Sequence, residues 1–549
     1  MRVSYLVNRR RVLQSGLMGA GLMGAVFAGA LTTALPALAQ SASTQSAPAQ
    51  SNTLYGPVAD NAVMGGRLNM GLLVEPPGLD PFHQAADARI RLTVLIYQGL
   101  FYEGPTGEAV PLLAESYTVS DDGLVYTIKL RQGVTFHTGE AMTAKDVAYS
   151  YNYIRNPENG SPGAGDFATI SDITAVDDYT VKVTLKLPNA SLPMTLGNKY
   201  GAVVPAGYFD NESAKNLLNT KSVGTGPFIL AEFAPNSHII LDKNPNYWDK
   251  GMPYLDGVDF SILPNSASML VALRNKRIDL VALNRPQDVQ QVQGVKGLEI
   301  NRWPSLGQAS IDLGLETKPL DNQLVRQAIS LAVDKNEIMQ ASIGDLGTVL
   351  GTIPAALQEQ WGLPLDELPL KGPDPEAARE LLKQAGMEKG FALSLTTING
   401  YDWMDAAAVT LREQLGRVGI TLNIQRVDLG VWINNFRSSK MGFTFNDWAS
   451  QPDPNLLFFR HFHSKPEGAD FRNWNNTEAS TLLDKGRATS DPAARRQIYL
   501  DFQKILAESV PTIMLFSPDH ITVRSQKVQN YVQHPTGWYY GLARTYLSE

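Results

Sequence analysis

The stretch from Leu112 to Ile154 constrains the fold of this chain more than any other part of its sequence. After a turn at 121–123, apolar and polar residues alternate over 125–130, which is the pattern of a half-buried strand. Thr143 lies three residues before Asp146, ahead of an apolar helical face, so a hydroxyl N-cap and a first-turn acid predict an amphipathic helix. The stretch is therefore predicted to form strand, turn, strand, loop and helix as one unit.

The same stretch resembles a known family. Its segments AESY (114–117), LRQGVTFHTGE (130–140) and TAKDVAYSY (143–151) are similar to motifs of the large solute-binding proteins of ABC importers, the dipeptide, oligopeptide and nickel-binding family (family 5). One departure is Thr138, where family members usually carry an acid. The resemblance implies an α/β fold of the periplasmic-binding-protein type (type II, large three-domain variant), with two lobes, mixed sheets and a hinge. It also implies that the second lobe, which contains His137, stands apart from the ligand cleft.

Length and the resemblance together predict the domain organisation. At 549 residues the chain exceeds the size at which one core keeps growing, so two or three domains are expected. We expect a signal peptide at 1–39, a flexible leader at 40–65, lobe I at 66–97, 189–283 and 516–549, lobe II at 98–188, and lobe III at 284–515.

Hydrophobic periodicity predicts further elements along the chain. Alternation indicates a first strand over 66–72 and a second hairpin at 177–187, in the same sheet as the first. Apolar spacing and caps indicate helices over 324–333 and 377–385. A β-α-β unit with parallel strands is expected from 392–397, 406–418 and 420–426, and 511–515 is expected to be the strand that crosses back into lobe I.

The N-terminus has the features of an export signal. A basic segment with Arg9 and Arg10 precedes an apolar run over 17–35 and the small-residue cleavage site Ala37-Leu38-Ala39. The arginine pair resembles a twin-arginine signal, and an ordinary Sec signal is the alternative. We expect a mature protein from about Gln40 that is free, soluble and periplasmic.

Composition excludes several function classes. Without the four arginines of the signal, 43 bases stand against 54 acids, a formal net charge of −11, which argues against nucleic acid or an anionic membrane as partner. The chain has no cysteine, which removes disulfides, thiolate nucleophiles and a lipid-anchoring N-terminal cysteine.

No catalytic or metal-binding pattern stands out. The chain has seven histidines and neither a Gly-x-Ser-x-Gly elbow nor a His-Glu-x-x-His motif, so we expect no enzyme and no cofactor. His461 and His463 would face the same side of a strand and could share a metal. No third histidine lies close by, however, and Arg460 and Lys465 would repel a cation, so we expect no metal site.

The ligand site is predicted by the resemblance to lie between the first and third lobes. The segment after a third-lobe strand, which here contains Asp447, Trp448, Ser450 and Gln451, lines the cleft in the family. Peptide-binding relatives have an acid two or three residues after this tryptophan, where this chain has Ser450 and Gln451.

Dipeptide-binding relatives also clamp the ligand carboxylate with an arginine after the strand equivalent to 392–397, and 398–403 contains none. Loss of both charge partners would cost about 2–5 kcal/mol each, so a free dipeptide is disfavoured. Asp447 or Asp453 could replace the missing acid, which leaves longer peptides open, although Asp453 before Pro454 is also expected to cap a turn.

Aromatic and polar residues define the predicted contacts. The candidate ligand-binding residues are Trp448, Asp447, Ser450, Gln451, Tyr401, Asp402, Trp403, Trp474 and Asn475. Aromatic faces with amide and carboxylate rims suit a sugar, an opine-like conjugate or a cation, and packing in a core is the alternative for each tryptophan.

The resulting hypothesis is a periplasmic substrate-binding protein of an ABC importer. It would capture an oligopeptide, a peptide-like or opine ligand, or an oligosaccharide by lobe closure. A permease with its ATPase complex would be its partner, and we expect a monomer that binds no nucleic acid. The alternatives are a sensory protein that feeds a receptor and a hydrolase on the same scaffold.

Overall fold

The structure, a computed structural model, describes residues 44–45, 55–84, 86–210, 219–283, 285–449, 452–464 and 472–548. These residues all belong to one compact unit. Three sheets organise it, and no helix in these ranges is long and apolar enough to cross a membrane.

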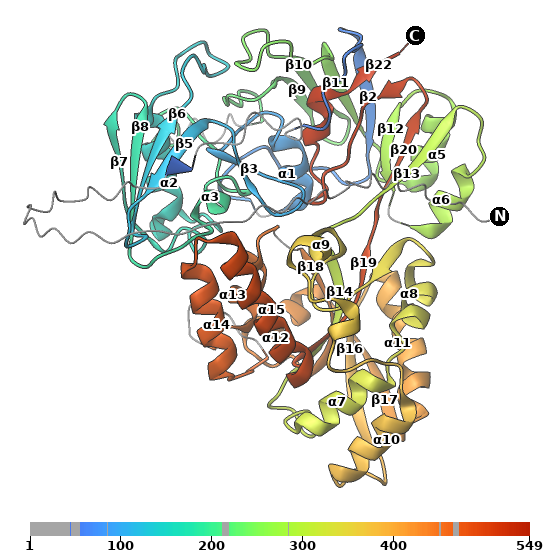
Figure 1. The fold of residues 1–549 in the computed structure, drawn as a ribbon. Helices are drawn as coiled ribbons and strands as arrows, with labels where there is room; N and C mark the ends of the chain where they lie inside the picture. The colour runs from blue at the N-terminus through green and yellow to red at the C-terminus, as the bar shows by residue number, and fades with distance from the viewer. Residues whose placement is uncertain are drawn as a thin grey trace, which may run out of the picture. The chain divides into compact units, whose positions relative to one another are not determined.

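The five-stranded sheet is antiparallel and contains the two strands of the stretch 112–154 (Figure 1). Its order is β1 (Thr44–Gln45), β5 (Ala114–Val119), β6 (Val125–Leu130), β8 (Thr180–Leu185) and β7 (Ile170–Asp177). Tyr126, Ile128 and Leu130 point into the core, as the alternation predicted. Both predicted hairpins therefore lie in one sheet.

Helix α2 (Ala144–Arg155) packs on β7 and β8 of this sheet. Its start has the predicted cap, because the Thr143 backbone N–H donates to Asp146 Oδ2 at 2.7 Å and the Thr143 hydroxyl donates to the same atom at 3.0 Å. His137 is held by backbone, with Nε2 3.1 Å from the Gly226 carbonyl oxygen, so its role is structural.

The seven-stranded sheet is mixed and brings together distant parts of the chain. Its order is β13 (Leu298–Trp303), β20 (His520–Ser525), β12 (Leu280–Leu283), β2 (Arg67–Leu72), β11 (Gly257–Ile262), β10 (His238–Lys243) and β9 (Phe228–Ala234). The central strand β2 runs parallel to β11 and β12. Helices α5 (Ser266–Arg274) and α6 (Pro286–Val292) flank β12 in the chain.

The six-stranded sheet carries most of the helices. Its order is β15 (Gly347–Val349), β19 (Thr512–Pro518), β14 (Gly307–Leu313), β18 (Phe443–Ala449), β16 (Phe391–Ile398) and β17 (Ile420–Val427). Strand β16 is parallel to β17 and β18, and α11 (Asp402–Gly416) connects β16 to β17, which confirms the predicted β-α-β unit.

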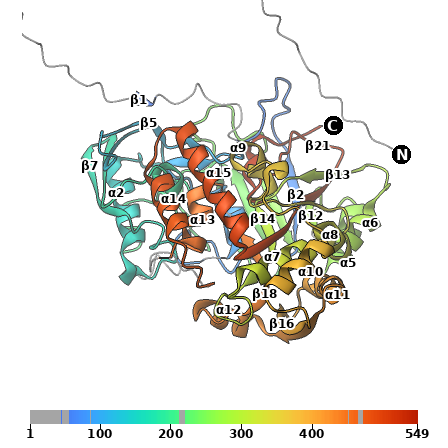
Figure 2. The ribbon, with the colours of Figure 1, turned by 60° about the horizontal axis from the view of Figure 1, so that its bottom comes forward.

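Two groups of helices cover the two faces of this sheet (Figure 2). One core contains α7 (Gln323–Ala332), α8 (Lys335–Ile343), α10 (Pro375–Gln384) and α11. The other contains α9 (Gln358–Trp361), α13 (Pro454–Phe462), α14 (Thr477–Ala488) and α15 (Pro492–Ser509), with α12 (Leu429–Arg437) at its border. As predicted, Asp374 caps α10 and accepts from the Ala377 N–H at 2.9 Å.

The remaining helices and strands are short. They are α1 (Asp87–Thr93), β3 (Phe101–Glu103), β4 (Ala109–Pro111), α3 (Leu192–Thr195), β21 (Val528–Gln529) and β22 (Tyr546–Leu547). Tyr55, which lies in the stretch predicted to be a flexible leader, is buried, and its hydroxyl is 2.9 Å from that of Tyr247. Aromatic packing against Tyr102 and Tyr540 fixes this residue.

Two chain crossings join the six-stranded and seven-stranded sheets, at 304–306 and at Asp519. The Ser517 hydroxyl donates to the Ser305 carbonyl at 3.1 Å, so the two crossings touch each other. The lobe boundaries at 284 and 515 stay predictions, and strand pairing bears on both. Strand β13, which follows the boundary at 284, still pairs within the seven-stranded sheet. Strand β19, which covers the predicted crossing strand 511–515, pairs within the six-stranded sheet as far as Pro518. The chain enters the seven-stranded sheet only with the next strand, β20.

Candidate ligand-binding site

The candidate site lies where the parallel strands of the six-stranded sheet end. The chain passes from β16 through α11 to β17 on one side, and then through α12 to β18 on the other side of β16. Helix α11 belongs to one face of the sheet, whereas Trp432 of α12 donates to Thr444 at 3.0 Å on the opposite face. Ligands of open α/β sheets bind outside the carboxyl ends of strands at such a reversal.

Three predicted residues gather at the start of α11, beside this edge. Trp403 is half-buried, with its ring centroid 5.5 Å from that of Phe445 and 5.7 Å from that of Phe516. Tyr401 is half-buried at the N-cap position, and Asp402 is exposed at the first helical residue. Tyr401 and Trp403 therefore pack partly against the core of the six-stranded sheet, whereas the exposed side chain of Asp402 is accessible to a solute.

Asp447 lies on the neighbouring strand, on the same face as Phe445 and Trp403. Alternation along β18 places 443, 445 and 447 on that face, and Asp447 pairs with Ala309 of β14. Its side chain is exposed, and desolvation by the neighbouring protein raises the pKa of its carboxyl to about 6. No hydrogen bond or ion pair to another described residue occupies this carboxylate, which makes it available to a ligand.

The segment after Asp447 is only partly described. The backbone of Trp448 pairs with Gln308 of β14, which extends the strand to the edge. Ser450, Gln451 and the side chain of Trp448 lie outside the described residues. Their predicted contacts with ligand therefore stay predictions.

The structure separates Trp474 from these residues. Its ring is buried, with centroids 6.0 Å from Phe462 and 6.4 Å from Phe502, in the core formed by α13, α14 and α15. That core lies on the face of the sheet opposite Asp447. Asn475 is exposed just before α14. Trp474 and Asn475 therefore do not lie beside Trp403 at the edge of the six-stranded sheet.

Asp453 is occupied by structure, as one of the two interpretations predicted. It caps α13 by accepting from the Asn455 N–H at 2.8 Å, and it is paired with Arg495. Of the two acids proposed to replace the missing one, Asp447 is therefore the accessible one.

The histidine pair differs from the prediction. His461 lies in the last turn of α13 and His463 is its C-cap residue, so the two are not on a strand and do not share a face. The helical apolar spacing of Leu457, Phe458 and Phe462 outweighed the short polar-apolar alternation. Among the described residues, no group of three or more histidine, cysteine, aspartate or glutamate side chains is placed to hold a metal.

Arg285 lies within electrostatic range of Asp402, and its sequence context did not predict this. It follows β12, whose carboxyl end lies beside those of β2 and β11, and it donates to Asp288 at 2.9 and 3.1 Å. The Asp288 carboxylate raises the pKa of Arg285, and the charge of Asp402 adds to this effect. Asp402 therefore interacts electrostatically with Arg285, which follows β12 of the seven-stranded sheet. The polar run after a short apolar strand was the available signal, but it did not indicate a partner more than 100 residues away in the chain.

The fold now defines the class of protein. The chain has two mixed sheets that are joined by two crossings, and each sheet contains parallel strands. This is the periplasmic-binding-protein fold in its large type II variant. The described fold agrees with that of DppA from Helicobacter pylori in complex with the peptide STSA, at a TM-score of 0.74 and 27% identity, covering 89% of this chain and 99% of that chain. AgaA from A. tumefaciens R10 in complex with agropinic acid matches at a TM-score of 0.74 and 25% identity, over 88% of this chain and 99% of that chain.

Sequence comparison leads from the class to the family. The dipeptide-binding protein of Escherichia coli (strain K12) is 27% identical over 460 residues, which cover 79% of this chain and 85% of that protein. The family model of bacterial extracellular solute-binding proteins, family 5 Middle, matches residues 108–470. The chain belongs to this family, and the resemblance drawn from its sequence is confirmed. Members of the family are binding proteins.

Proposed function

We propose that this protein captures a peptide-like or opine-like solute with a cationic group and delivers it to an ABC permease. The observation that carries the proposal is the accessible carboxylate of Asp447, which faces no described cation at the carboxyl edge of β18. An exposed carboxylate with no cation beside it among the described residues can pair with a ligand ammonium or guanidinium, and exclusion of water on binding would strengthen that pair.

Aromatic residues and a second acid support this ligand class. Trp403 and Tyr401 present ring surface at the start of α11, next to the exposed Asp402. Cations bind over aromatic faces and beside carboxylates. Relatives whose names specify a dipeptide, the peptide STSA and agropinic acid fit the same chemical range.

Capture is proposed to proceed by closure about the two crossings. Ser305 and Ser517 link the crossings, so the six-stranded sheet and its helices would rotate as a body against the seven-stranded sheet. The ligand stabilises the closed form through contacts with both carboxyl edges. Only the closed, loaded form would dock productively on the permease and its ATPase complex.

The proposed place of action is the periplasm, reached through the signal at 1–39, with twin-arginine export favoured by Arg9 and Arg10. The chain has no cysteine, so it has no thiol for catalysis and none for a lipid anchor. We propose no enzymatic activity.

Native mass spectrometry of the protein purified from its own periplasm tests the proposal. The expected result is one solute per chain that carries a basic nitrogen and leaves chemically unchanged after release. A solute converted into a product on incubation would instead indicate an enzyme. A bound neutral sugar would contradict the ligand class while leaving the binding function intact.

A further inference from the structure

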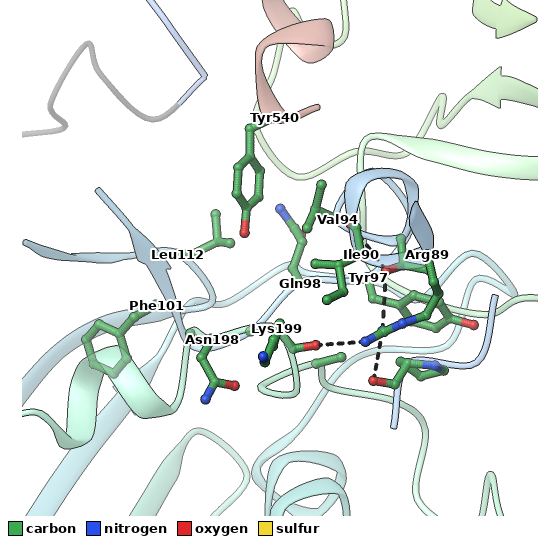
Figure 3. A pocket seen from close by; sticks show the side chains of 15 residues that line it. Arg89, Ile90, Val94, Tyr97, Gln98, Phe101, Leu112, Asn198, Lys199 and Tyr540 are labelled. Atoms are coloured by element: carbon green, nitrogen blue, oxygen red, sulfur yellow. Dashed lines mark hydrogen bonds between the residues drawn. The ribbon is translucent and has the colours of Figure 1, made fainter. Parts of the chain in front are cut away.

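A small cavity with a mixed lining lies among α1, the loop after it and the segment that follows α3 (Figure 3). Its volume is about 30 Å³, and it opens to solvent. Its polar lining is Arg89, Thr93, Tyr97, Gln98, Asn198 and Lys199, and its apolar wall includes Ile90, Val94, Phe101, Leu112 and Tyr540. None of the residues described at the edge of β16 and β18 lines it.

Arg89 is a buried cation of this cavity with neutral partners only. Its side chain is 1% exposed. The guanidinium donates to the Pro81 carbonyl at 3.1 Å and, at 3.5 Å, to the Thr93 hydroxyl and the Lys199 carbonyl, while Nε has no partner among the described residues. Burial lowers the pKa of Arg89 to about 10, which leaves the group charged at neutral pH.

Lys199 adds a second cation to the same lining. Its ammonium lies 5.3 Å from the centroid of the Tyr200 ring, and no ion pair joins it to a carboxylate of the described chain. Burial lowers the pKa of Lys199; the charges of Asp166 and Glu103 oppose this shift, and those of Arg460 and Arg89 add to it. Two positive groups therefore line one cavity.

Three acids lie near these two cations. Burial raises the pKa of Glu103 to about 8, so this fully buried carboxyl, which has no hydrogen-bond partner in the described part of the chain, is mostly neutral at pH 7. Asp166 is one counter-charge, and it accepts from the Asn198 amide at 3.1 Å. Asp80, the acid nearest Arg89 on the other side, is paired with His83 at 2.8 Å.

We propose that this cavity binds an oxyanion, a carboxylate or phosphate group, between Arg89 and Lys199. The anion receives charge-assisted hydrogen bonds from the unpaired Nε–H of Arg89 and from the Lys199 ammonium. A buried cation whose hydrogen-bond partners are all neutral is costly, so an oxyanion would offset that cost for Arg89 and add to the partial compensation that Asp166 gives Lys199. The site goes beyond the proposed function, because its residues belong to other elements than the carboxyl edge of β16 and β18.

A free ion and the acidic end of a solute would supply the same chemistry, so the test has two arms. Isothermal titration at constant ionic strength measures binding of inorganic phosphate and acetate in the first arm, and of the tetrapeptide Ser-Thr-Ser-Ala in the second. Each probe is titrated into the wild type, Lys199→Met and Lys182→Met. Lys182 is exposed on β8, so its variant removes the same charge away from the cavity.

The expected result is binding to the wild type and Lys182→Met that is at least about tenfold weaker in Lys199→Met. Weakened phosphate or acetate binding identifies a free ion, and an effect on the tetrapeptide alone identifies the end of a solute. Arg89→Lys, which keeps the charge but loses the planar fork, should show the same loss and serves if Lys199→Met does not fold. The proposal is overturned if no probe distinguishes Lys199→Met from Lys182→Met, including the case in which none binds.

Asp447→Asn separates this site from the proposed function. The anion site predicts unchanged binding of phosphate and acetate in that variant, because Asp447 does not line the cavity. A loss of phosphate binding on Asp447→Asn would contradict two separate sites.

Discussion

Asp453 and Arg495 form a buried, bidentate ion pair, with Nη1 2.8 Å from Oδ2 and Nη2 2.9 Å from Oδ1. The pair ties the start of α13 to α15 directly after the candidate ligand segment. Because Asp453 is satisfied in this way, it leaves Asp447 as the accessible acid of that segment. The proposed function therefore assigns the cationic group of the ligand to Asp447 and not to Asp453.

Removal of one partner of this pair should strongly destabilise the protein. Arg495→Met leaves a buried carboxylate without its cation, and we expect a loss of about 3–5 kcal/mol in the free energy of unfolding. Urea denaturation at pH 7 measures it. The matched change Glu413→Gln removes the exposed pair with Arg417 at 2.8 Å and should cost far less, because solvent screens this pair. Equal losses in the two variants would show that the buried pair has no special role.

Asp447→Asn should stabilise the ligand-free protein at neutral pH. Burial raises the folded-state pKa of Asp447 to about 6 from its ordinary 3.8, so ionisation costs folding free energy as pH rises between these values. The amide removes this cost, and because the side chain is exposed the gain is at most about 1 kcal/mol.

Melting temperatures of the wild type and Asp447→Asn at pH 4 and pH 7.5 test this sign. The variant should melt higher at pH 7.5 and equally at pH 4. The exposed turn variant Asp121→Asn is the control and should show no such difference. A lower melting temperature of Asp447→Asn at pH 7.5 would mean that a stabilising partner holds this carboxylate.

Gly107→Ala should disturb the segment that follows the candidate site. Gly107, between β3 and β4, has φ +92°, and a Cβ there would lie 2.1 Å from the Pro452 carbonyl oxygen. Gly133 has φ +74° with open space around its would-be Cβ, so Gly133→Ala carries the backbone strain alone. We expect Gly107→Ala to lower the melting temperature more than Gly133→Ala and to weaken ligand binding. Identical behaviour of the two variants would show that the contact with Pro452 is dispensable.

Trp474→Ala tests whether this tryptophan is a core residue. Its ring is 4% exposed, and truncation of such a side chain costs about 3–5 kcal/mol through the cavity that it leaves. Chemical denaturation measures this loss, and the neighbouring exposed Asn475→Ala should be neutral. A stable Trp474→Ala protein that no longer binds solute would return the residue to the ligand site.

The hydrophobic pattern of the sequence predicted helices and strands correctly where one face of the element is buried in the core. The alternation at 125–130 and the caps at Thr143 and Asp374 depend on neighbours in the sequence, and the structure has β6, α2 and α10 where they were expected. The family motifs within 112–154 were equally local, which is why they sufficed to identify the family.

The site could be predicted only in part, because its members meet through tertiary packing. Tyr401, Asp402 and Trp403 follow β16, and Asp447 lies near the end of the parallel strand β18, so local pattern could place them at one edge, while their contact with ligand stays a prediction. Trp474 was expected with them, although composition alone cannot distinguish an aromatic core residue from a ligand contact. Arg89 and Lys199 are 110 residues apart and share no motif, so their common cavity had no signal in the sequence.

The central claim is that Asp447 holds the cationic group of the captured solute. Isothermal titration of the co-purifying solute into ligand-free wild type and Asp447→Asn at pH 7.5 tests it most directly. We predict at least about a hundredfold loss of affinity in the variant, since a charge-assisted contact is removed and the ligand cation is left unpaired. Equal affinity of the two proteins for that solute would contradict the claim.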